Sequence, residues 1–198
     1  MGVSLRLSLC AILNLCLAAC AKPAAPPKFE PIWMPGSDGT MVHRPSGIRV
    51  SDEVGSFHKE REFFGEWQDY RVFYARGAEQ GTILVSFSGV HTSAANAEPC
   101  GTMIDRSAGY ADRKVWHKER LEPWRYIAPL FVGMEAGKAA AYNTVLDVDD
   151  VDLPMRADVY ILCGTGGSWI VEYEARYPRD VDGSSWIDEL IAATAPQS

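Results

Sequence analysis

The sequence lacks an apolar run long enough to cross a membrane, and it lacks an excess of basic residues. Its longest mainly apolar stretch, residues 7–19, falls short of the roughly 20 residues that a transmembrane helix needs. Nineteen lysines and arginines stand against 26 aspartates and glutamates, which gives a formal net charge of −7. Nucleic-acid binding needs a basic surface that neutralises phosphates, so we expect no nucleic-acid partner.

The sequence also lacks the compact motifs of catalytic and cofactor sites. No two histidines follow the His-x-x-x-His spacing, and there is no Cys-x-x-Cys motif. The four histidines are His43, His58, His91 and His117. Ser86 and Ser88 lie at the end of a predicted strand rather than in the Gly-x-Ser-x-Gly turn of esterases, and Cys163 lies within a strand. We therefore predict no catalytic residue and no cofactor.

The first twenty residues form a signal-peptide pattern. One positive residue, Arg6, precedes the mainly apolar residues 7–19, whose length suits the core of a secretory signal. The pattern ends in Leu17-Ala18-Ala19-Cys20, an aliphatic residue, two small residues and a cysteine. This ending resembles the lipobox of bacterial lipoprotein precursors, in which the cysteine is acylated and the signal is removed. The resemblance implies that residues 1–19 are cleaved off and that Cys20 carries lipid; an ordinary secretory signal is the alternative.

Residues 20–41 are predicted to tether the folded domain to the lipid. Closely spaced prolines between Ala21 and Lys28 favour an extended, semi-rigid spacer. By the same resemblance, Ala21 after the cysteine favours the outer membrane if the cell has two membranes. We expect a palmitate-carrying lipoprotein of the cell envelope that faces the periplasm. Loss of Arg6 with the signal makes the net charge −8, which disfavours direct adhesion of the domain to anionic lipid.

Two cysteines remain after the signal and the lipid site are accounted for. Cys10 and Cys16 belong to the signal and Cys20 is the acylation site, which leaves Cys100 and Cys163. In an exported chain, two remaining cysteines favour a disulfide. The alternative is two separate buried thiols, since free cysteine is often buried.

Residues 42–198 have the length and composition of one globular domain. Alternation of apolar and polar residues at period two predicts strands, and short glycine-containing connections, including Gly164–Gly167, join two of the strand pairs as hairpins. The predicted strands are residues 57–64, 70–74, 82–87, 139–146, 157–163 and 169–177. In the last strand Glu172, Glu174 and Arg176 face away from the apolar positions, which indicates a sheet with one buried and one exposed face.

Two helices are expected beside this sheet. Residues 185–191 carry an apolar stripe and precede Pro196, which predicts a C-terminal helix after the long hairpin. A second helix is predicted within residues 94–115, with Met103 and Ile104 pointing inward. The order of elements indicates an α+β domain with a mainly antiparallel sheet.

Several segments of the domain resemble a set of uncharacterised bacterial envelope proteins. The segments are Ser46–Ile48, Val54–Lys59, the 70–87 hairpin, Trp169–Pro178 and the closing helix. Their layout resembles the PsbP/Mog1-like α+β sandwich. The resemblance implies the fold and carries over no catalytic residue.

Two clusters are candidate sites. The acidic residues Asp147, Asp149, Asp150 and Asp152 have the oxygen ligands that hard cations prefer, but they lack the glycine and distal glutamate of a calcium loop, and a solvated loop between strands is the favoured explanation. The aromatic and basic residues Trp116, Trp124, Arg125 and Tyr126 have the composition of an interaction surface; a cap over the sheet is the other explanation and the favoured one.

These observations predict a lipid-anchored envelope protein that acts as a non-enzymatic binding or structural module. Its expected partners are the membrane, through Cys20, and another envelope protein. Two alternatives stay open: an envelope hydrolase whose residues converge only in the folded chain, and a lipoprotein that binds a metal or small ligand.

Overall fold

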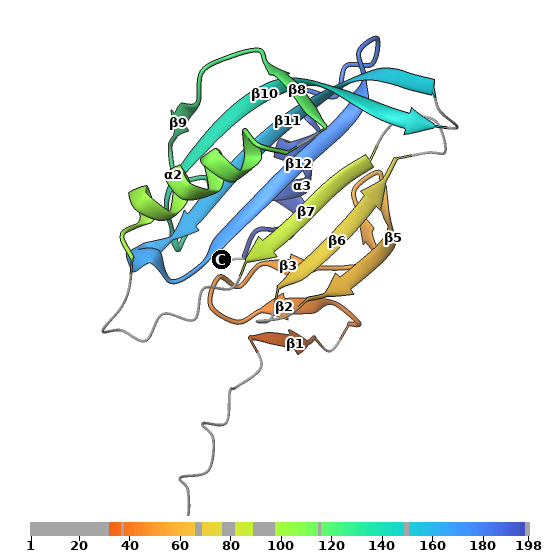
Figure 1. Ribbon diagram of the computed structural model, residues 1–198. Coiled ribbons are helices and arrows are strands. Elements are labelled where there is room, and N and C mark those ends of the chain that lie inside the picture. The colour runs from red at the N-terminus through yellow and green to blue at the C-terminus, as the bar shows by residue number, and fades with distance from the viewer. Residues whose placement is uncertain are drawn as a thin grey trace, which may run out of the picture. The chain divides into compact units, whose positions relative to one another are not determined.

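The computed structural model describes residues 32–36, 38–65, 69–76, 82–88, 98–114, 116–148 and 151–196 (Figure 1). For residues 82–88, 147 and 148 it describes the backbone only. The predicted signal, Cys20 and most of the predicted tether lie outside the described residues. Lipidation of Cys20 therefore stays a prediction.

The main element is an antiparallel sheet in the strand order β4-β5-β6-β7-β12-β11-β10-β8, with β9 also paired to β10 (Figure 1). Its strands are β4 (Glu53–Val54), β5 (Phe57–Phe64), β6 (Tyr70–Ala75), β7 (Thr82–Ser88), β8 (His117–Arg120), β9 (Arg125–Ile127), β10 (Met134–Val148), β11 (Val151–Gly164) and β12 (Ile170–Pro178). The helices are α2 (Cys100–Ala111) and α3 (Trp186–Thr194), with the short 3-10 turn η4 (Thr165–Gly167) between β11 and β12. The prediction of a mainly antiparallel α+β domain with a C-terminal helix is confirmed.

A small second sheet of three short strands precedes the main one. It consists of β1 (Trp33–Pro35), β2 (Met41–His43) and β3 (Arg49–Val50). Ile32 and Trp33, the first described residues, are buried in the main core. The folded part thus begins before the predicted boundary at residue 42. Strands of two or three residues carry too few alternating positions for a sequence pattern to reveal them.

The main core lies between the sheet and α3. Tyr173, Val171 and Tyr177 of β12 face this side with Tyr70 and Val72 of β6. The predicted apolar stripe of α3 packs against them: Trp186, Ile187, Leu190 and Ile191 are all nearly inaccessible to solvent. The period-two and period-3.6 patterns therefore meet at one interface, as their amphipathic spacing requires.

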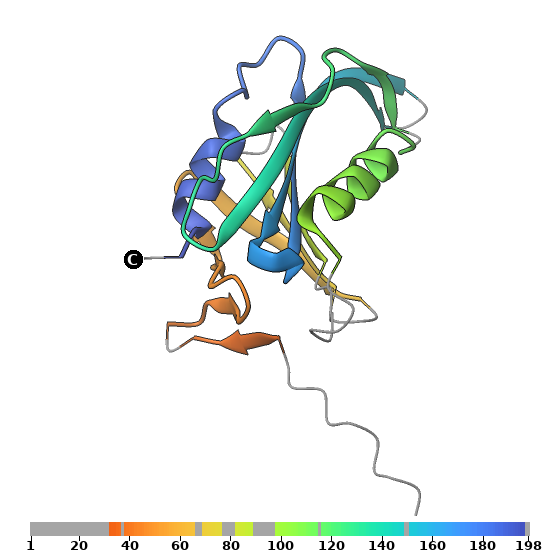
Figure 2. The same ribbon diagram turned by 90° about the vertical axis from the view of Figure 1, so that its left-hand side faces the viewer.

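The opposite face of the sheet is also covered, by α2. Figure 2 shows the two helices on opposite sides of the strands. Met103 and Ile104 of α2 are fully buried, as predicted, against Ala157, Val159 and Ile161 of β11. The prediction of one solvent-exposed face is wrong here, and Glu174, predicted to face water, has no solvent-exposed surface. Alternation along a strand assigns residues to two faces but does not show what covers each face.

A disulfide fixes the start of α2 to the end of β11. Cys100 and Cys163, the two cysteines paired in the sequence analysis, are bonded, with their Cα atoms 5.8 Å apart. Gly167 of η4 approaches the same corner with a φ of +68°, and a Cβ there would lie 2.0 Å from the carbonyl oxygen of Glu98. Only glycine fits this contact, so the turn after β11 and the residues before α2 are held together twice.

Among the described residues, no helix combines the length and the apolar character needed to span a bilayer.

Breaking the disulfide is expected to destabilise the domain. The bond joins residues 63 positions apart, and in the chain-entropy model a closed loop of this length contributes about 4 kcal/mol to the free energy of unfolding. Replacing both cysteines, Cys100→Ser with Cys163→Ser, should lower that free energy by about 2–4 kcal/mol in urea denaturation. Adding reductant should lower the stability of the unsubstituted chain similarly and leave the double variant unchanged. Equal stability of the two chains under oxidising conditions would contradict this expectation.

Acid should weaken the small N-terminal sheet through His43. Burial lowers the pKa of His43 to about 4, and its Nδ1 lies 2.7 Å from Ser46 Oγ. The His43 ring takes up a proton near pH 6.5 in the unfolded chain and only near pH 4 in the folded chain. Its contribution to the free energy of unfolding is therefore fully present above pH 6.5 and is lost as the pH falls toward 4. Between pH 7 and pH 4.5 this group should remove about 2–3 kcal/mol.

The measurement is urea denaturation of the chain and of His43→Gln at both pH values. The variant should lose less stability on acidification than the unsubstituted chain. His58→Gln, at an exposed position, is the matched control and should follow the unsubstituted chain. A His43 variant with unchanged pH dependence would exclude this source of acid sensitivity.

Candidate functional site

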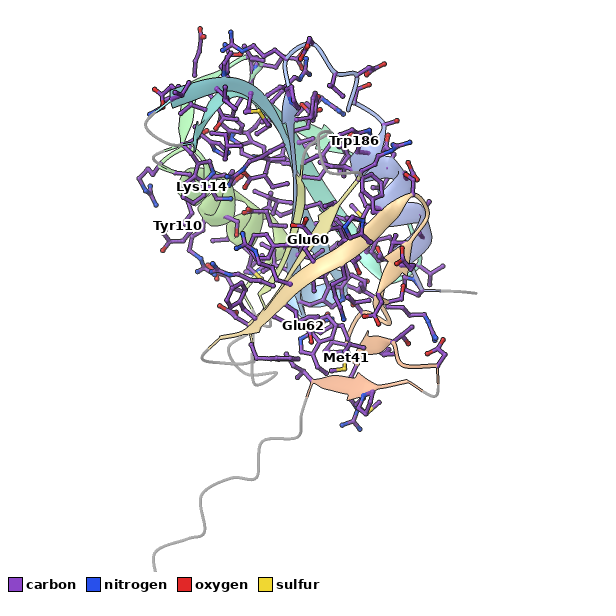
Figure 3. All side chains as sticks on the ribbon, turned by 90° about the vertical axis from the view of Figure 1, so that its right-hand side faces the viewer. Met41, Glu60, Glu62, Tyr110, Lys114 and Trp186 are labelled. Carbon is purple, nitrogen blue, oxygen red and sulfur yellow. A yellow bond between two sulfur atoms is a disulfide. The ribbon has the colours of Figure 1, made fainter. Side chains whose placement is uncertain are left out.

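The most concentrated group of charges lies between the sheet and the segment that follows α2. Glu172, Glu174 and Arg176 come from alternate positions of β12, and Lys114 and His117 come from the connection between α2 and β8 and from the start of β8. Figure 3 labels Lys114 beside α2. Alternation along β12 puts its three charged side chains on one face, and the chain after α2 returns across that face.

Glu174 is the centre of this group. Its Oε1 accepts hydrogen bonds from Arg176 Nε at 2.6 Å and Trp116 Nε1 at 3.2 Å, and His117 Nε2 lies 3.4 Å away. Its Oε2 accepts a hydrogen bond from Lys114 Nζ at 2.5 Å. Both carboxylate oxygens are therefore occupied by donors, and the side chain is fully buried.

The charges in this cluster compensate one another. Lys114 also donates to Glu172, so two cations, Lys114 and Arg176, face two carboxylates. Burial by itself raises the pKa of Glu174, but the hydrogen bond from His117 and the charges of Lys114 and Arg176 outweigh burial and hold the pKa well below its usual range. Burial likewise lowers the pKa of Lys114, and the two glutamates more than reverse this, so the pKa is raised.

A second group of polar side chains continues from His117. Its Nδ1 lies 2.8 Å from the carbonyl oxygen of Ala111, and its ring stacks on Tyr142 with centroids 4.0 Å apart. Tyr142 donates to Asp112 at 2.8 Å, and Asp112 also accepts from Arg120 and Trp124. The C-terminal end of α2 is thereby joined to β8 and β10 by side chains.

The structure separates the four residues of the predicted interaction surface. Trp116 and Trp124 are half-buried and cap the sheet through their contacts with Glu174 and Asp112. Arg125 is exposed, with its guanidinium 5.9 Å from the ring of Tyr160. Tyr126 is 71% exposed. An interaction role for Arg125 and Tyr126 stays a prediction.

The predicted acidic site is only partly described. Asp149 and Asp150 lie outside the described residues, and the side chain of Asp147 is not described. The backbone register places Asp147 directly opposite Asp152, which is exposed, near the end of the β10–β11 hairpin. Within the described residues, no group of three or more histidine, cysteine, aspartate or glutamate side chains is placed to hold a metal ion. The cation hypothesis for this hairpin stays untested.

The other candidate residues lie apart from one another. His43 is buried in the small sheet, His58 is exposed on β5, and His91 lies outside the described residues. The side chains of Ser86 and Ser88 are not described, and Cys163 is bonded to Cys100. His117 is the one histidine that the described contacts bring into the charged cluster.

Sequence reasoning missed the cluster itself. Glu172, Glu174 and Arg176 were assigned to solvent, and Lys114 was not singled out. The available signal was a Glu-x-Glu-x-Arg alternation on a strand with strongly apolar neighbours. A signal of this kind shows charges on one face, whereas the lysine and histidine that contact Glu174 come from a segment about 60 residues earlier.

The geometry of the cluster favours a structural role. A carboxylate that acts as a general acid or base needs a pKa near the working pH and an open path to substrate. Glu174 has neither: its pKa is depressed and its surface is covered. A substrate atom would have to displace one of the donors that hold it.

No protein-family model matches the sequence, and no curated protein is significantly similar to it.

Removing the charge of Glu174 is expected to destabilise the domain. Glu174→Gln leaves Lys114 and Arg176 without their shared buried carboxylate, and breaking a buried ion pair in this way typically costs about 3–5 kcal/mol. Glu172→Gln is the matched control, because Glu172 contacts the same lysine but keeps 19% of its side chain exposed. In urea denaturation at pH 7, Glu172→Gln should lower the free energy of unfolding by less than half as much as Glu174→Gln.

The difference between the Glu174 variant and the unsubstituted chain should depend on pH. The depressed pKa means that Glu174 contributes stability above its unfolded pKa of about 4.3, and that this contribution is lost as the pH falls below that value. The difference should be largest at pH 7 and narrow at pH 3. A constant difference would mean that lost packing, rather than lost charge, explains the effect.

Proposed function

We propose that this chain is a lipid-anchored protein of the bacterial cell envelope whose domain acts as a non-enzymatic binding or structural module. The lipid on Cys20 would hold it at the membrane, with the domain on the periplasmic side. The likeness to uncharacterised envelope proteins of PsbP/Mog1-like layout belongs to the same proposal.

The sequence and one covalent bond support the location. The lipobox-like ending of the signal pattern supplies the anchor, and the prolines after it supply a spacer. The Cys100–Cys163 bond supports an exported chain, because disulfides persist in oxidising compartments and are rare in the cytosol.

The observation that carries the non-enzymatic role is the closure of the Glu174 cluster. The strongest concentration of ionisable side chains among the described residues surrounds a fully buried Glu174 and joins the residues that follow α2 to β8 and β12. Such a network fixes secondary structure elements to one another, and this is what a scaffold for a binding surface needs.

Substitution of Cys20 tests the anchor. Cys20→Ser should abolish incorporation of a labelled fatty acid and leave the signal uncleaved, because the cysteine sulfur is the acylation site. Cys16→Ser, four residues earlier in the same signal, is the matched control and should be labelled and processed normally. Intact mass of the protein extracted from membranes gives the cleavage site directly.

Fatty-acid labelling of the Cys20 variant at the level of the unsubstituted chain would refute the anchor. Processing at another residue without lipid would point to the ordinary secretory signal instead.

A further inference from the structure

One half of the sheet carries a face that no described element covers. In Figure 1, α2 lies in front of β10, β11 and β12, whereas β5, β6 and β7 have no helix in front of them. Along β6, Tyr70, Val72 and Tyr74 point into the main core. Arg71 and Phe73 alternate with them and therefore face the same side as α2.

Four residues of β5 and β6 form a checkerboard on this uncovered face, which we call the Arg–Phe patch. Arg61 is paired with Phe73 and Phe63 with Arg71 in the strand register. The guanidinium of Arg61 lies 4.1 Å from the centroid of the Phe73 ring, and the Phe63 and Phe73 rings meet edge to face at 5.8 Å. Phe63 is 53% exposed. Flat aromatic and guanidinium groups thus stand together on a solvent-facing surface.

Neither arginine of the Arg–Phe patch lies within 4.0 Å of a carboxylate oxygen of the described residues, although Arg71 acts on Asp69: burial raises the pKa of Asp69, and the charge of Arg71 opposes that rise. Most other described arginines do form an ion pair: Arg49, Arg76, Arg106, Arg120, Arg156 and Arg176 each lie within 4.0 Å of an aspartate or glutamate oxygen. Two arginines without an ion pair among the described residues, on a chain of net charge −7, leave positive charge for an anionic partner, and Arg61 is the less compensated of the two.

The patch borders an open edge of the sheet. The short strand β4 pairs only with Phe57 and His58, and the N–H of Lys59 donates to the carbonyl oxygen of Asp52, so residues 60–64 of β5 have no described strand on their outer side. Figure 3 views the molecule from this side, with β5 in front. An uncovered edge presents backbone N–H and C=O groups that a further strand can pair with.

We infer that an acidic, extended segment of another envelope protein binds here by adding a strand to β5. A carboxylate opposite Arg61 would meet its guanidinium, and an apolar side chain two residues away would pack on Phe63, because cross-strand neighbours share a face. Arg71 adds positive charge to the same face. This inference deepens the proposed binding role and rests on it for the class of partner.

The edge carries features that restrict its partners. A bulge between Lys59 and Arg61 interrupts the pairing of β5 with β6, and Glu60 and Glu62 add negative charge. On the core side, Glu62 is bound by Tyr70 and Lys59, so its charge is partly compensated there. Bulges and charged residues prevent indiscriminate pairing of edge strands. They leave a segment whose charges are complementary to those of the edge as the favoured partner.

A strand fits this site better than a lipid surface. Lipid headgroups cannot form the regular series of backbone hydrogen bonds that an open strand edge offers. A domain with this negative net charge is also repelled by an anionic bilayer as it approaches. Binding to a membrane is nevertheless a distinct outcome of the experiment below.

The test is selection of random decapeptides by display on the full chain, purified in detergent. Selected peptides should be rich in Asp and Glu and should lose at least tenfold in affinity for the double variant Arg61→Glu/Arg71→Glu. Selection on that variant should instead enrich Lys and Arg. Backbone N-methylation at alternate peptide positions should remove binding as strongly, because it removes the strand hydrogen bonds.

The matched control is Arg113→Glu/Arg179→Glu, which changes the net charge by the same amount. Both arginines are exposed; Arg113 lies just after α2 and Arg179 directly after β12. Its affinity for the selected peptides should stay within twofold, and thermal unfolding should show both double variants folded. Acidic enrichment that is unchanged by the patch substitutions would overturn the inference. The inference would also be overturned if no peptide bound and the chain instead bound phosphatidylglycerol vesicles in a way that the patch substitutions abolish.

Failure here is distinguishable from failure of the proposed function. Peptide binding in detergent does not require lipid on Cys20, and labelling of Cys20 does not require the Arg–Phe patch. Peptide binding without lipidation would refute the lipid anchor alone, and lipidation without peptide binding would refute the docking strand alone.

Discussion

Burial of the Glu174 carboxylate is the constraint on which the second layer of the domain depends. A carboxylate without solvent is tolerated only when donors surround it, and the donors come from β12 itself and from residues 114–117. The chain leaving α2 must therefore return across β12. At the other end of the helix, Cys100 is bonded to Cys163. One covalent bond and one charge cluster thus hold the two ends of α2, with the apolar contacts of Met103 and Ile104 between them.

This arrangement gives the two halves of the sheet different surroundings. From β10 to β12 both faces are covered, and the side chains that meet α2 are engaged with one another. From β5 to β6 the described elements cover only the core face, and the opposite face exposes Arg61, Phe63 and Arg71. A rigid, closed half beside an open half with an unpaired strand edge is the division expected of a module that binds through one side of a sheet and is stabilised through the other.

The sequence predicted those parts of the fold that depend on local periodicity. The strands around 70–74, 157–163 and 169–177, the helix at 185–191 and the inward side of α2 all follow from spacings of two or 3.6 residues. What it did not reveal depends on contacts between distant segments. Glu174 looks solvent-exposed until Lys114 and His117 are placed over it, and Trp33 looks like part of a tether until β1 pairs with β2. The prediction that Cys100 and Cys163 are bonded depended on the oxidising compartment expected for an exported chain, not on the spacing of the two cysteines.

The Arg–Phe patch shows the same limit at the scale of one residue. Strict alternation from Phe57, which is buried in the main core, would place Lys59, Arg61 and Phe63 on the core face. The bulge after Lys59 inserts one residue, so that Arg61 and Phe63 change to the opposite face and meet Phe73, while Glu62 and Phe64 reach Tyr70 on the core side. The composition of the exposed face is therefore set by Glu60, whose own side chain is not part of the patch. A reading of the sequence that assumes a regular strand assigns these arginine and phenylalanine side chains to the core, where an unpaired guanidinium would be costly. The bulge resolves that conflict, and by resolving it creates the surface that we infer to bind an acidic strand.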